Sequence, residues 1–550
     1  MTMKPLQKDS YLVWVLFWSI IPIAWLFMGE GLWHTHDGLV HIPRIAAFYR
    51  ALMEGHIPPR VAGYLNYGYG MPLFIFIYHI PYYVSSLFIT LGLSLADSFR
   101  LALSITYPLS GIAIYLFGRS FFENRKYAFW MFLFYQFAPY RFVDLHMRGS
   151  FGESYTYIFL PLALWGLTEL FKTSQYRWFI VATLSTAFLI MSHNSISLAY
   201  FGILCLFTLV FAPSHKGRVI GIVSLIAGVG LSAWYWIPAI VEHKYTYGDL
   251  LMKNVYIDHF VPWYHYIVPN FYNMESFIFQ GIMAQFGIFH IVAILFAIVI
   301  LVKQRGSVLE KKQYAFGLFL LVTSIFLMQP VSTPLWKHIS LLRQFQFPWR
   351  FLAVVVFATS FLSTAYLSFN FAKNRRTLIT IAAFVAVSTV FYWVPQYGHN
   401  DIDEAYYWDF PLNTTYYGET DVIWSAGPAG SYPSSPVQVI DGYATVTNIV
   451  KKGHIHTFTV DASESARLVD NTQYFPGWRV YVDGEKTPVE FQDMNWRGLV
   501  TFAVPDGKHD VRVVFGRTPV RLGAEIISIV MMGVLIVIAP FFQRILNHEQ

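Results

Sequence analysis

Residues 11–28, YLVWVLFWSIIPIAWLFM, form an uncharged apolar stretch that is followed closely by WHTHDG at residues 33–38. A stretch of this length can span a bilayer. Lys4 and Lys8 precede it and no A-x-A-like cleavage site follows it, so we expect a retained first span and not a removed signal peptide. The motif WHTHDG is then predicted to lie just outside the bilayer, where a structural loop has little need of a carboxylate flanked by histidines.

The composition of the whole chain extends this interpretation. Its 550 residues are 55% hydrophobic and 13% charged, and the mean hydropathy is +0.45. Soluble domains carry roughly a quarter charged residues, so a polytopic membrane protein is expected. The net charge of +6 comes from basic residues in short loops, which is not a nucleic-acid signal. Cys205 is the single cysteine, and it excludes an intramolecular disulfide.

About twelve segments are apolar enough to be spans. They lie near residues 11–29, 98–118, 127–142, 155–172, 177–192, 195–212, 219–240, 283–302, 314–330, 350–369, 377–395 and 522–543.

Basic residues divide the loops between these segments into two sets. The positive-inside rule assigns the basic set to the cytoplasm and predicts that both termini are cytoplasmic. This set comprises Lys4, Lys8, Arg119, Arg125, Lys126, Lys172, Arg177, Lys216, Arg218, Lys303, Arg305, Lys311, Lys312, Lys373, Arg375, Arg376 and Arg544.

The assignment requires that residues 72–93 do not cross the membrane. Pro72, Pro81 and several tyrosines favour an interfacial or re-entrant helix there. If the segment does cross, the basic loop 119–126 lies outside.

Residues 396–520 form the longest outer segment and have a different composition. Period-2 runs alternate with the turn signals Asp483-Gly484 and Asp506-Gly507, which are typical of β-hairpins. We expect an all-β sandwich that acts as a lid, docks a partner or positions substrate, followed by a last span and cytoplasmic tail at 521–550. The expected strands lie within 437–440, 443–450, 454–460, 478–482, 499–504 and 511–515.

The first outer loop, residues 30–97, carries the leading candidate residue. Apolar residues recur every three to four positions after Asp37, which predicts an amphipathic helix on the membrane surface. Asp37 is either the N-cap of this helix or a functional carboxylate. His34, His36 and His41 are either metal ligands or interfacial polar residues, and Arg44 follows them on the same helix.

Three further segments contribute candidates. Arg148 and Glu153 lie near Asp144, His146, Gly149 and Gly152, and the glycines would allow a ligand to approach the backbone. His193 and Asn194 lie in a short connection between two spans. Either they face protein or a cavity at membrane depth, or Asn194 and Ser195 cap a turn. Arg343, Gln346 and Arg350 open a later span, either as phosphate ligands or as interfacial anchors. Neither a Walker loop nor a dinucleotide fingerprint nor G-x-S-x-G is found.

At these residues the chain resembles the C-type (GT-C) glycosyltransferase superfamily of polytopic membrane enzymes. In that family, an aspartate of the first outer loop acts as base or binds the acceptor, and an interfacial helix follows. Asp37 and residues 72–93 hold these positions. The matching segments are THDGLVHIPR (35–44), NYGYGMPLFIFIYHIPYY (66–83), APYRFVDLHMRGSFGES (138–154), MSHNSIS (191–197) and QFPWRF (346–351). They also resemble bacterial membrane proteins called "6-pyruvoyl-tetrahydropterin synthase-related".

The C-terminal segments YFPGWRVYVDGEKTPVE (474–490) and VPDGKHDVRVVFGRTPVRLG (504–523) are similar to the end of the YfhO-like family, where an outer β-domain precedes a final span. The chain departs from many relatives in one respect, because Asp37 stands alone where they carry an acidic pair. The resemblance therefore implies a transferase that uses a lipid-monophosphate donor and needs no metal.

We expect an inverting glycosyltransferase of the bacterial inner membrane. It would move a hexose or pentose from a polyprenyl-phosphate donor to an extracytoplasmic acceptor of the cell envelope, with Asp37 as general base. The other candidates, His34, His36, His41, Arg44, Arg148, Glu153, His193, Asn194, Arg343, Gln346 and Arg350, would bind substrate. The alternatives are a transporter or scaffold for lipid-linked sugars, whose β-domain recruits envelope proteins, and a metal-dependent transferase that uses His34 and His36.

Overall fold

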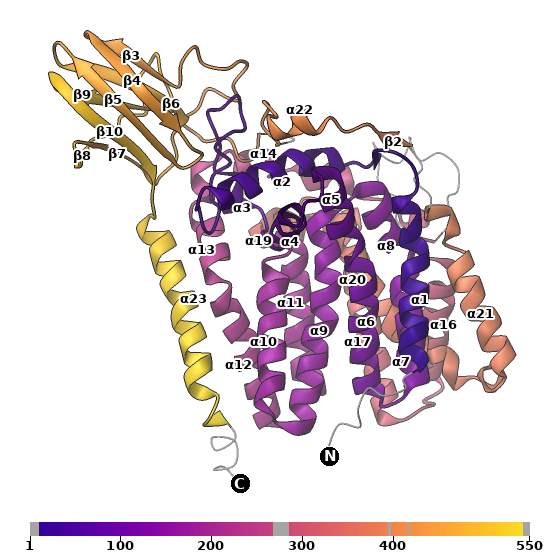
Figure 1. Cartoon of the computed structure of the whole chain (residues 1–550). Helices are drawn as coiled ribbons and strands as arrows, with labels where there is room; N and C mark the ends of the chain where they lie inside the picture. Colours follow the sequence, from indigo (N-terminus) through magenta and orange to yellow (C-terminus); the bar gives the residue numbers. More distant parts are fainter. Residues whose placement is uncertain (1–9, 268–284, 394–397, 416–417, 543–550) are drawn as a thin grey trace.

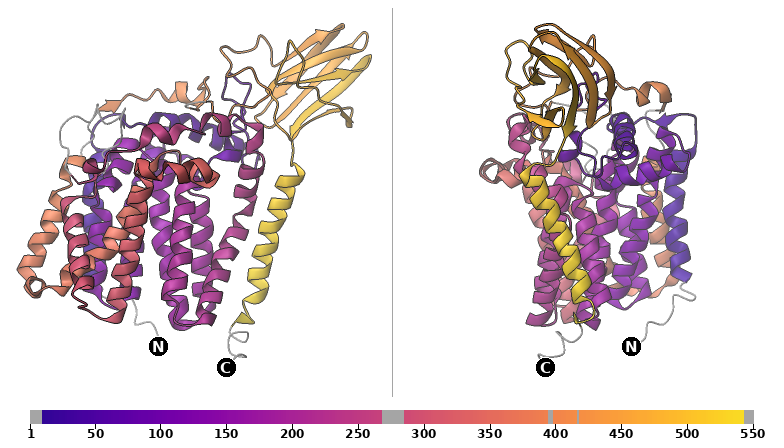
Figure 2. Two further views of the ribbon diagram at one scale, coloured as in Figure 1. Left: turned by 180° about the vertical axis from the view of Figure 1, so that it is seen from behind. Right: turned by 60° about the vertical axis from the view of Figure 1, so that its left-hand side comes forward.

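A computed structural model describes residues 10–267, 285–393, 398–415 and 418–542. Long helices run side by side in a bundle, and a β-domain stands over one edge of it (Figures 1 and 2). The bundle helices are α1 (Ser10–Ala24), α6 (Thr106–Phe122), α7 (Arg125–Gln136), α9 (Phe151–Thr173), α10 (Tyr176–Ile190), α11 (Asn194–Phe211), α12 (His215–Leu231), α16 (Ile288–Val302), α17 (Val308–Leu327), α20 (Leu352–Leu362), α21 (Arg375–Val387) and α23 (Pro519–Ile538).

Fewer helices than predicted have the length and hydropathy of a membrane span. Six qualify among the described residues, or up to eight if each of two bent pairs is counted as one span. The bends are 68° between α12 and α13 (Ala233–Val241), and 83° between α17 and the helical residues Pro330–His338. Each predicted span coincides with a helix, but α7, α10 and α16 have only 12 to 15 residues. The predicted number of twelve spans is therefore not confirmed.

A layer of short helices covers the end of the bundle below the β-domain. It contains α2 (Gly38–Met53), α3 (Leu73–Phe76), α4 (Ile80–Thr90), α5 (Leu95–Ser104) and α22 (Glu404–Trp408). α2 begins where the apolar periodicity predicts, and it buries Ile42, Ile45 and Phe48 against the core. Figure 1 views α4 nearly along its axis, so this helix lies across the direction of the long helices.

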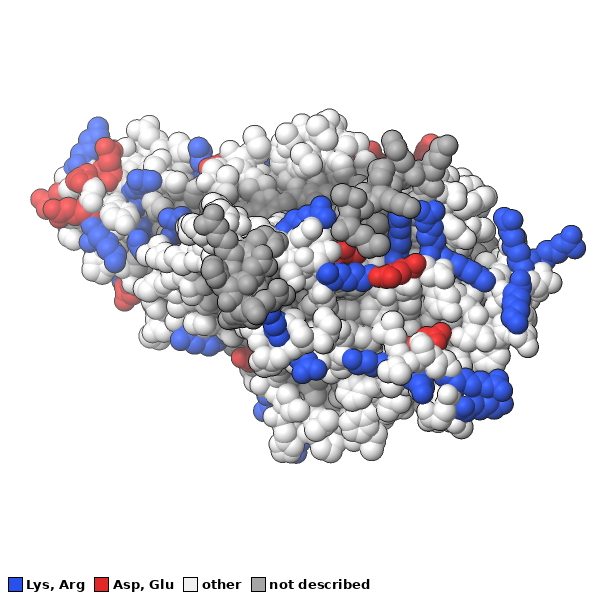
Figure 3. Space-filling view, turned by 90° about the horizontal axis from the view of Figure 1, so that it is seen from below, with Lys and Arg blue, Asp and Glu red and all other residues white. Residues whose placement is uncertain are grey.

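The opposite end of the bundle carries the basic loops. Figure 3 shows Lys and Arg side chains gathered on this face, with few Asp and Glu side chains. α1 begins and α23 ends on this side (Figure 1). The predicted markers Lys4, Lys8 and Arg544 lie outside the described residues, as does the expected start of one span at residue 283.

The predicted β-domain is present as two antiparallel sheets with a shared apolar core. The larger sheet has the order β4-β5-β10-β7-β8 and the smaller one β3-β6-β9. The strands are β3 (Val437–Asp441), β4 (Ala444–Lys451), β5 (Ile455–Ala462), β6 (Ala466–Gln473), β7 (Trp478–Val482), β8 (Glu485–Thr487), β9 (Leu499–Val504) and β10 (Gly507–Phe515).

One of the two predicted hairpin turns is correct. Asp483 and Gly484 have φ of 51° and 86° and connect β7 to β8, which pair with each other. The prediction for Asp506-Gly507 was wrong, because β9 pairs with β6 whereas β10 pairs with β5 and β7. This Asp-Gly step carries the chain from one sheet to the other.

The β-domain also begins later than residue 396. Its first strand starts at Val437, and the expected boundary at 395–396 lies outside the described residues. Residues 398–415 lie along the layer of short helices instead. Within this segment, β2 (His399–Asn400) pairs with β1 (Leu32–Trp33). The Glu404 carboxylate accepts hydrogen bonds from the first two amides of α5. These contacts tie the segment to the bundle, which is why it lies outside the sandwich.

Candidate functional site

The first outer loop is attached to the segment that follows α7. Between α8 (Pro139–Phe142) and α9 the chain forms a π-helix, η2 (Val143–Arg148). The amides of His36 and Asp37 donate to the carbonyls of Met147 and Arg148 at 3.1 and 2.9 Å. π-Helical turns widen a helix and are frequent at functional sites. Two of the predicted outer segments, which are far apart in sequence, are thereby joined through their backbones.

Gly149 and Gly152 make this arrangement possible, but they do so by packing against protein. Gly149 has φ +64°, and a Cβ there would lie 2.7 Å from Thr35 Oγ1. A Cβ on Gly152 would lie 2.4 Å from the Ser192 carbonyl oxygen and 2.5 Å from the Tyr78 ring. The expected close approach therefore exists, and its partners are the first outer loop and the α10–α11 turn.

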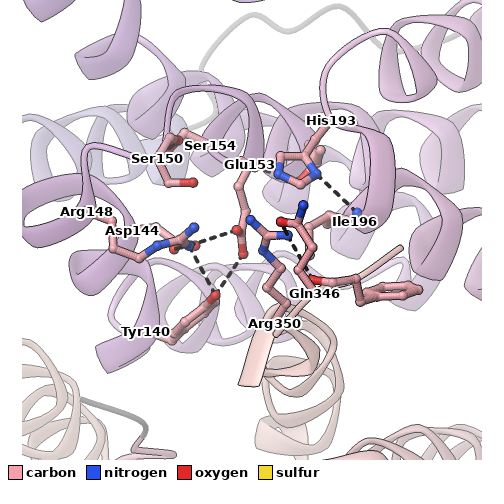
Figure 4. A network of polar contacts seen from close by, with 12 residues as sticks. Tyr140, Asp144, Arg148, Ser150, Glu153, Ser154, His193, Ile196, Gln346 and Arg350 are labelled. Carbon is pink, nitrogen blue, oxygen red and sulfur yellow. Dashed lines mark hydrogen bonds and ion pairs between the residues drawn. The ribbon is translucent and has the colours of Figure 1, made fainter. Parts of the chain in front are cut away.

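A polar cluster lies at this junction, in which Tyr140, Asp144, Arg148, Glu153 and His193 are buried and Gln346 and Arg350 are half-buried (Figure 4). Arg148 pairs with both Asp144 and Glu153, with 2.8 Å from Nη1 to Glu153 Oε2. Tyr140 donates to Glu153 Oε1 at 2.9 Å, and Tyr157 donates to Asp144 Oδ2 at 2.8 Å. Both carboxylates are thus satisfied by an arginine and a tyrosine, which is what burial of charge requires.

Arg350 is bound differently from Arg148. Its Nη1 donates to the Phe345 carbonyl at 2.8 Å and to Gln346 Oε1 at 3.1 Å, and both acceptors are neutral. Its Nε is buried without a hydrogen-bond partner in the described part of the chain. The guanidinium lies over the Phe347 ring, 4.7 Å from its centroid. A cation with neutral partners and an unused donor is suited to bind an anion.

His193 is the N-cap of α11, whereas the capping interpretation of this turn expected Asn194 and Ser195 in that role. Its Nδ1 accepts the Ile196 amide at 3.2 Å, so in the neutral ring Nε2 carries the proton. The ring stacks on Tyr78 with centroids 5.6 Å apart. Figure 4 shows the other edge of the ring turned toward Glu153. His193 therefore has one N–H to offer at the cluster.

Asp37 occupies the N-cap position of α2, yet its carboxylate makes no capping hydrogen bond. Thr35 Oγ1 accepts the Gly38 amide instead, at 2.9 Å. Arg148, Arg350, Tyr78 and Tyr82 all lie within electrostatic range of the Asp37 carboxylate. The capping interpretation is therefore weakened, and Asp37 lies beside the cluster.

Two histidines close to Asp37 in the sequence, His36 and His41, have lowered pKa values. Burial, helped by Arg148 and His34, lowers the pKa of His36 although Asp37 opposes the shift. Burial and then Arg44 lower the pKa of His41 well below its usual value, and His41 Nδ1 lies 2.9 Å from the Tyr82 hydroxyl.

The other predicted residues make different contacts. His34 Nδ1 lies 3.2 Å from the Asn400 side chain, and Arg44 donates to Thr414 at 3.0 Å through Nε. Asn194 donates to the Phe76 carbonyl at 2.7 Å and accepts from the Tyr235 hydroxyl, so both ends of its amide hold elements together. Arg343 ends α19 (Ser340–Arg343) and makes no side-chain hydrogen bond or ion pair with the described residues.

Sequence reasoning missed Tyr140, Tyr157 and Tyr78 as members of the site. Tyrosine is so frequent in this chain, with 36 residues, that its positions carry little signal. The described parts of the chain contain no group of three His, Cys, Asp or Glu side chains arranged to hold a metal ion.

No protein-family model matches the chain, and no curated protein matches it. Among solved structures, the chain is similar to the apo form of the Archaeoglobus fulgidus oligosaccharyltransferase, at 12% identity and a TM-score of 0.46 over 74% of this chain and 61% of that one. It is also similar to that enzyme tethered through a disulfide to an acceptor peptide containing the NVT sequon, at 13% identity and a TM-score of 0.42 over 78% and 61%. This chain thus spans about three fifths of that enzyme's length. The family resemblances noted in the sequence stay predictions.

Proposed function

We propose that this protein is a GT-C-type membrane glycosyltransferase that acts at the face covered by the short helices. The observation that carries the proposal concerns Asp37, whose carboxylate makes no capping hydrogen bond, and Arg350, whose hydrogen bonds go only to neutral acceptors. The two lie within electrostatic range of each other at one polar cluster. A glycosyl transfer from a lipid phosphate needs one base and one stabilised leaving group. The motif resemblance supports the same class.

In the proposed reaction, an acceptor hydroxyl attacks the anomeric carbon of a sugar carried on polyprenyl phosphate. Asp37 takes the proton of that hydroxyl as the new C–O bond forms. The bond between the anomeric carbon and the phosphate oxygen breaks, and the lipid phosphate departs with its electron pair. Arg350 stabilises the charge that develops on the phosphate.

The surrounding residues would position the substrates. His193 would donate its Nε2 proton to a sugar or phosphate oxygen. Glu153 and Asp144 are poor candidates for the base, because each already accepts from Arg148 and from a tyrosine. The aromatic rings of Tyr78, Tyr82 and Trp349 would supply apolar surface for the sugar or the prenyl chain.

The setting of this reaction is part of the proposal. The protein would lie in a bacterial inner membrane with both termini cytoplasmic, and the acceptor would be an extracytoplasmic glycan or polymer of the cell envelope. The β-domain would dock the acceptor or an envelope-biogenesis protein. The reaction would need no metal, so we expect transfer to survive treatment with a chelator, whereas loss of transfer would favour the metal-dependent alternative through His34 and His36.

The first test compares wild-type protein with Asp37→Asn in membranes supplied with radiolabelled polyprenyl-phosphate sugars. Loss of a general base lowers turnover by about 10²- to 10⁴-fold, and we expect a loss in that range. Asp401→Asn is the matched control, because Asp401 is an exposed carboxylate on the same outer face.

Full transfer by Asp37→Asn would disprove the role of Asp37 as base. Binding of the sugar-lipid by every variant, without turnover by any of them, would favour the transporter or scaffold alternative.

A further inference from the structure

A second site candidate lies away from the cluster, where the β-domain meets the start of α23. A cavity of about 630 Å³ opens there. Its lining includes Tyr474, Trp478, Arg479, Lys486, Arg517 and Thr518. Volumes of this size are typical of ligand pockets, which range from roughly 300 to 1,000 Å³.

The charged side chains that line this cavity are all positive. Arg479 donates through Nη2 to the Arg517 carbonyl at 2.6 Å, which leaves its charge unneutralised. The Lys486 side chain makes no hydrogen bond or ion pair with the described residues, whereas Arg517 pairs with Glu525 at 2.5 Å. Two of the three cations thus lack a carboxylate partner in the described structure, which favours an anionic ligand.

The geometry of the hairpin directs these charges to one face. Arg479 and Tyr481 are two residues apart on β7, and Lys486 on β8 is paired with Tyr481. Alternate residues of a strand share a face, and so do directly paired residues of neighbouring strands. Arg479 and Lys486 therefore project from the same side of the hairpin.

The position of the cavity indicates where the anion comes from. Thr518 is the N-cap of α23, and α23 is a 20-residue helix with the hydropathy of a membrane span. Figures 1 and 2 show the β-domain directly above the end of this helix. The cavity is thus at the level where a bilayer places its head groups, on the side of the β-domain. The N-terminus of α23 adds positive potential at the same place.

We propose that this cavity binds the phosphate group of a membrane lipid. Arg479 would hold two phosphate oxygens through its fork of N–H donors, and Lys486 would act as a point charge. Bound lipid would anchor the β-domain to the membrane surface beside its last span. The proposal is independent of the proposed transfer reaction, because none of these residues belongs to the polar cluster.

The test uses full-length protein in detergent and measures equilibrium binding of two radiolabelled lipids, short-chain phosphatidylglycerol and farnesyl phosphate. Diacylglycerol with matched chains is the uncharged comparison. The variants are Arg479→Gln, Lys486→Gln and the double substitution, and Lys508→Gln is a matched control that removes one exposed charge at the other end of β10. Thermal unfolding of each variant verifies that the protein remains folded.

We expect the double variant to lose at least tenfold in affinity for a phosphate-bearing lipid, and Lys508→Gln to stay within twofold of wild type. If the double variant loses affinity for phosphatidylglycerol alone, the ligand is a phospholipid head group. If it loses affinity for farnesyl phosphate, the ligand is a prenyl phosphate. Equal affinity of wild type and double variant for both lipids, or equally tight binding of diacylglycerol, would overturn the proposal.

Discussion

Arg148 and Arg350 lie in the same cluster, and their neighbours give them different roles. Arg148 sits between two buried carboxylates and balances their charge. Arg350 donates to a carbonyl and an amide oxygen and keeps its charge. From sequence both were candidates for binding substrate, and the structure favours Arg350 for binding and Arg148 for stability.

Substitution of each arginine by alanine should separate these roles. We expect Arg350→Ala to lower transfer by about 10²- to 10³-fold, the usual cost of losing one donor to a developing charge, with little change in thermal stability. Arg148→Ala should destabilise the protein by about 3–5 kcal/mol, because it leaves Asp144 and Glu153 buried without their cation. Turnover and thermal unfolding of the same samples provide the two measurements.

Arg343→Ala serves as the comparison, because Arg343 opens the same segment and pairs with no described side chain. Arg350→Lys should recover part of the activity through its charge. Equal losses of transfer for Arg343→Ala and Arg350→Ala would contradict the assignment.

At the scale of elements, the central strand of the smaller sheet shows the limit of period-2 patterns. β6 was not predicted, and β8 was missed with it. Seven of the eight positions of β6 are buried, including Asp470, Asn471, Thr472 and Gln473. In a strand that is buried on both faces, apolar and polar residues do not alternate, so a period-2 pattern cannot identify it. His456 Nδ1 lies 2.6 Å from Asp470 Oδ2, and such contacts allow polar residues inside the domain.

Because β6 is buried, shortening one of its side chains should lower the free energy of unfolding substantially. Leu468 is fully buried in this strand, so we expect Leu468→Ala to destabilise the β-domain by about 2–5 kcal/mol. Val450→Ala on β4 is the control, because Val450 is 53% exposed and its truncation should change stability by about 0.5 kcal/mol or less. Chemical denaturation followed by fluorescence measures both, and equal effects would show that β6 is not a core strand.

At the scale of the whole molecule, a buried ion pair joins the bundle, the β-domain and the last helix. Arg521 of α23 pairs with Glu242 at 2.9 Å and donates to the Pro476 carbonyl at 2.7 Å. Thr518 donates to the other Glu242 oxygen at 2.6 Å. Glu242 follows α13 of the bundle. Its carboxylate binds the start of α23, and Arg521 extends the contact to the β-domain.

Glu242→Gln should therefore destabilise the protein by about 3–5 kcal/mol, since it leaves Arg521 buried without its counter-charge. Asp409→Asn is the matched control: Asp409 is exposed and its partner Arg50 is half-buried, and ion pairs at the surface contribute about 0–1 kcal/mol. Thermal unfolding in detergent gives both values, and a shift no larger than that of the control would show that the pair is dispensable.

The β-domain is also held by a loop of the outer layer. Lys451 donates to the Gly68 carbonyl at 3.0 Å, and the Gln473 amide donates to the Tyr69 carbonyl at 2.7 Å. A Cβ on Gly63 would lie 2.3 Å from Gly453 Cα, where only backbone could move to relieve the clash. This position needs glycine because two backbones meet there.

Gly63→Ala should consequently loosen the docking. We expect faster amide hydrogen exchange in residues 60–70 and 451–456, with unchanged exchange in the bundle helices. Gly430→Ala is the control, because a Cβ at Gly430 would meet no atom within 4 Å. Unchanged exchange in Gly63→Ala would mean that the β-domain does not depend on this contact.

The sequence by itself determined the apolar helices, the basic loops at one end of the bundle and the strands with one solvent-exposed face. These features are local, because hydropathy and its period along the chain report directly on exposure. Only the tertiary structure decided that Gly149 and Gly152 pack against protein, that Arg148 pairs with two carboxylates while Arg350 donates to neutral acceptors, and that Asp506-Gly507 crosses between sheets. Each of these depends on which distant residues meet, and chain order does not encode the partner of a buried charge or strand.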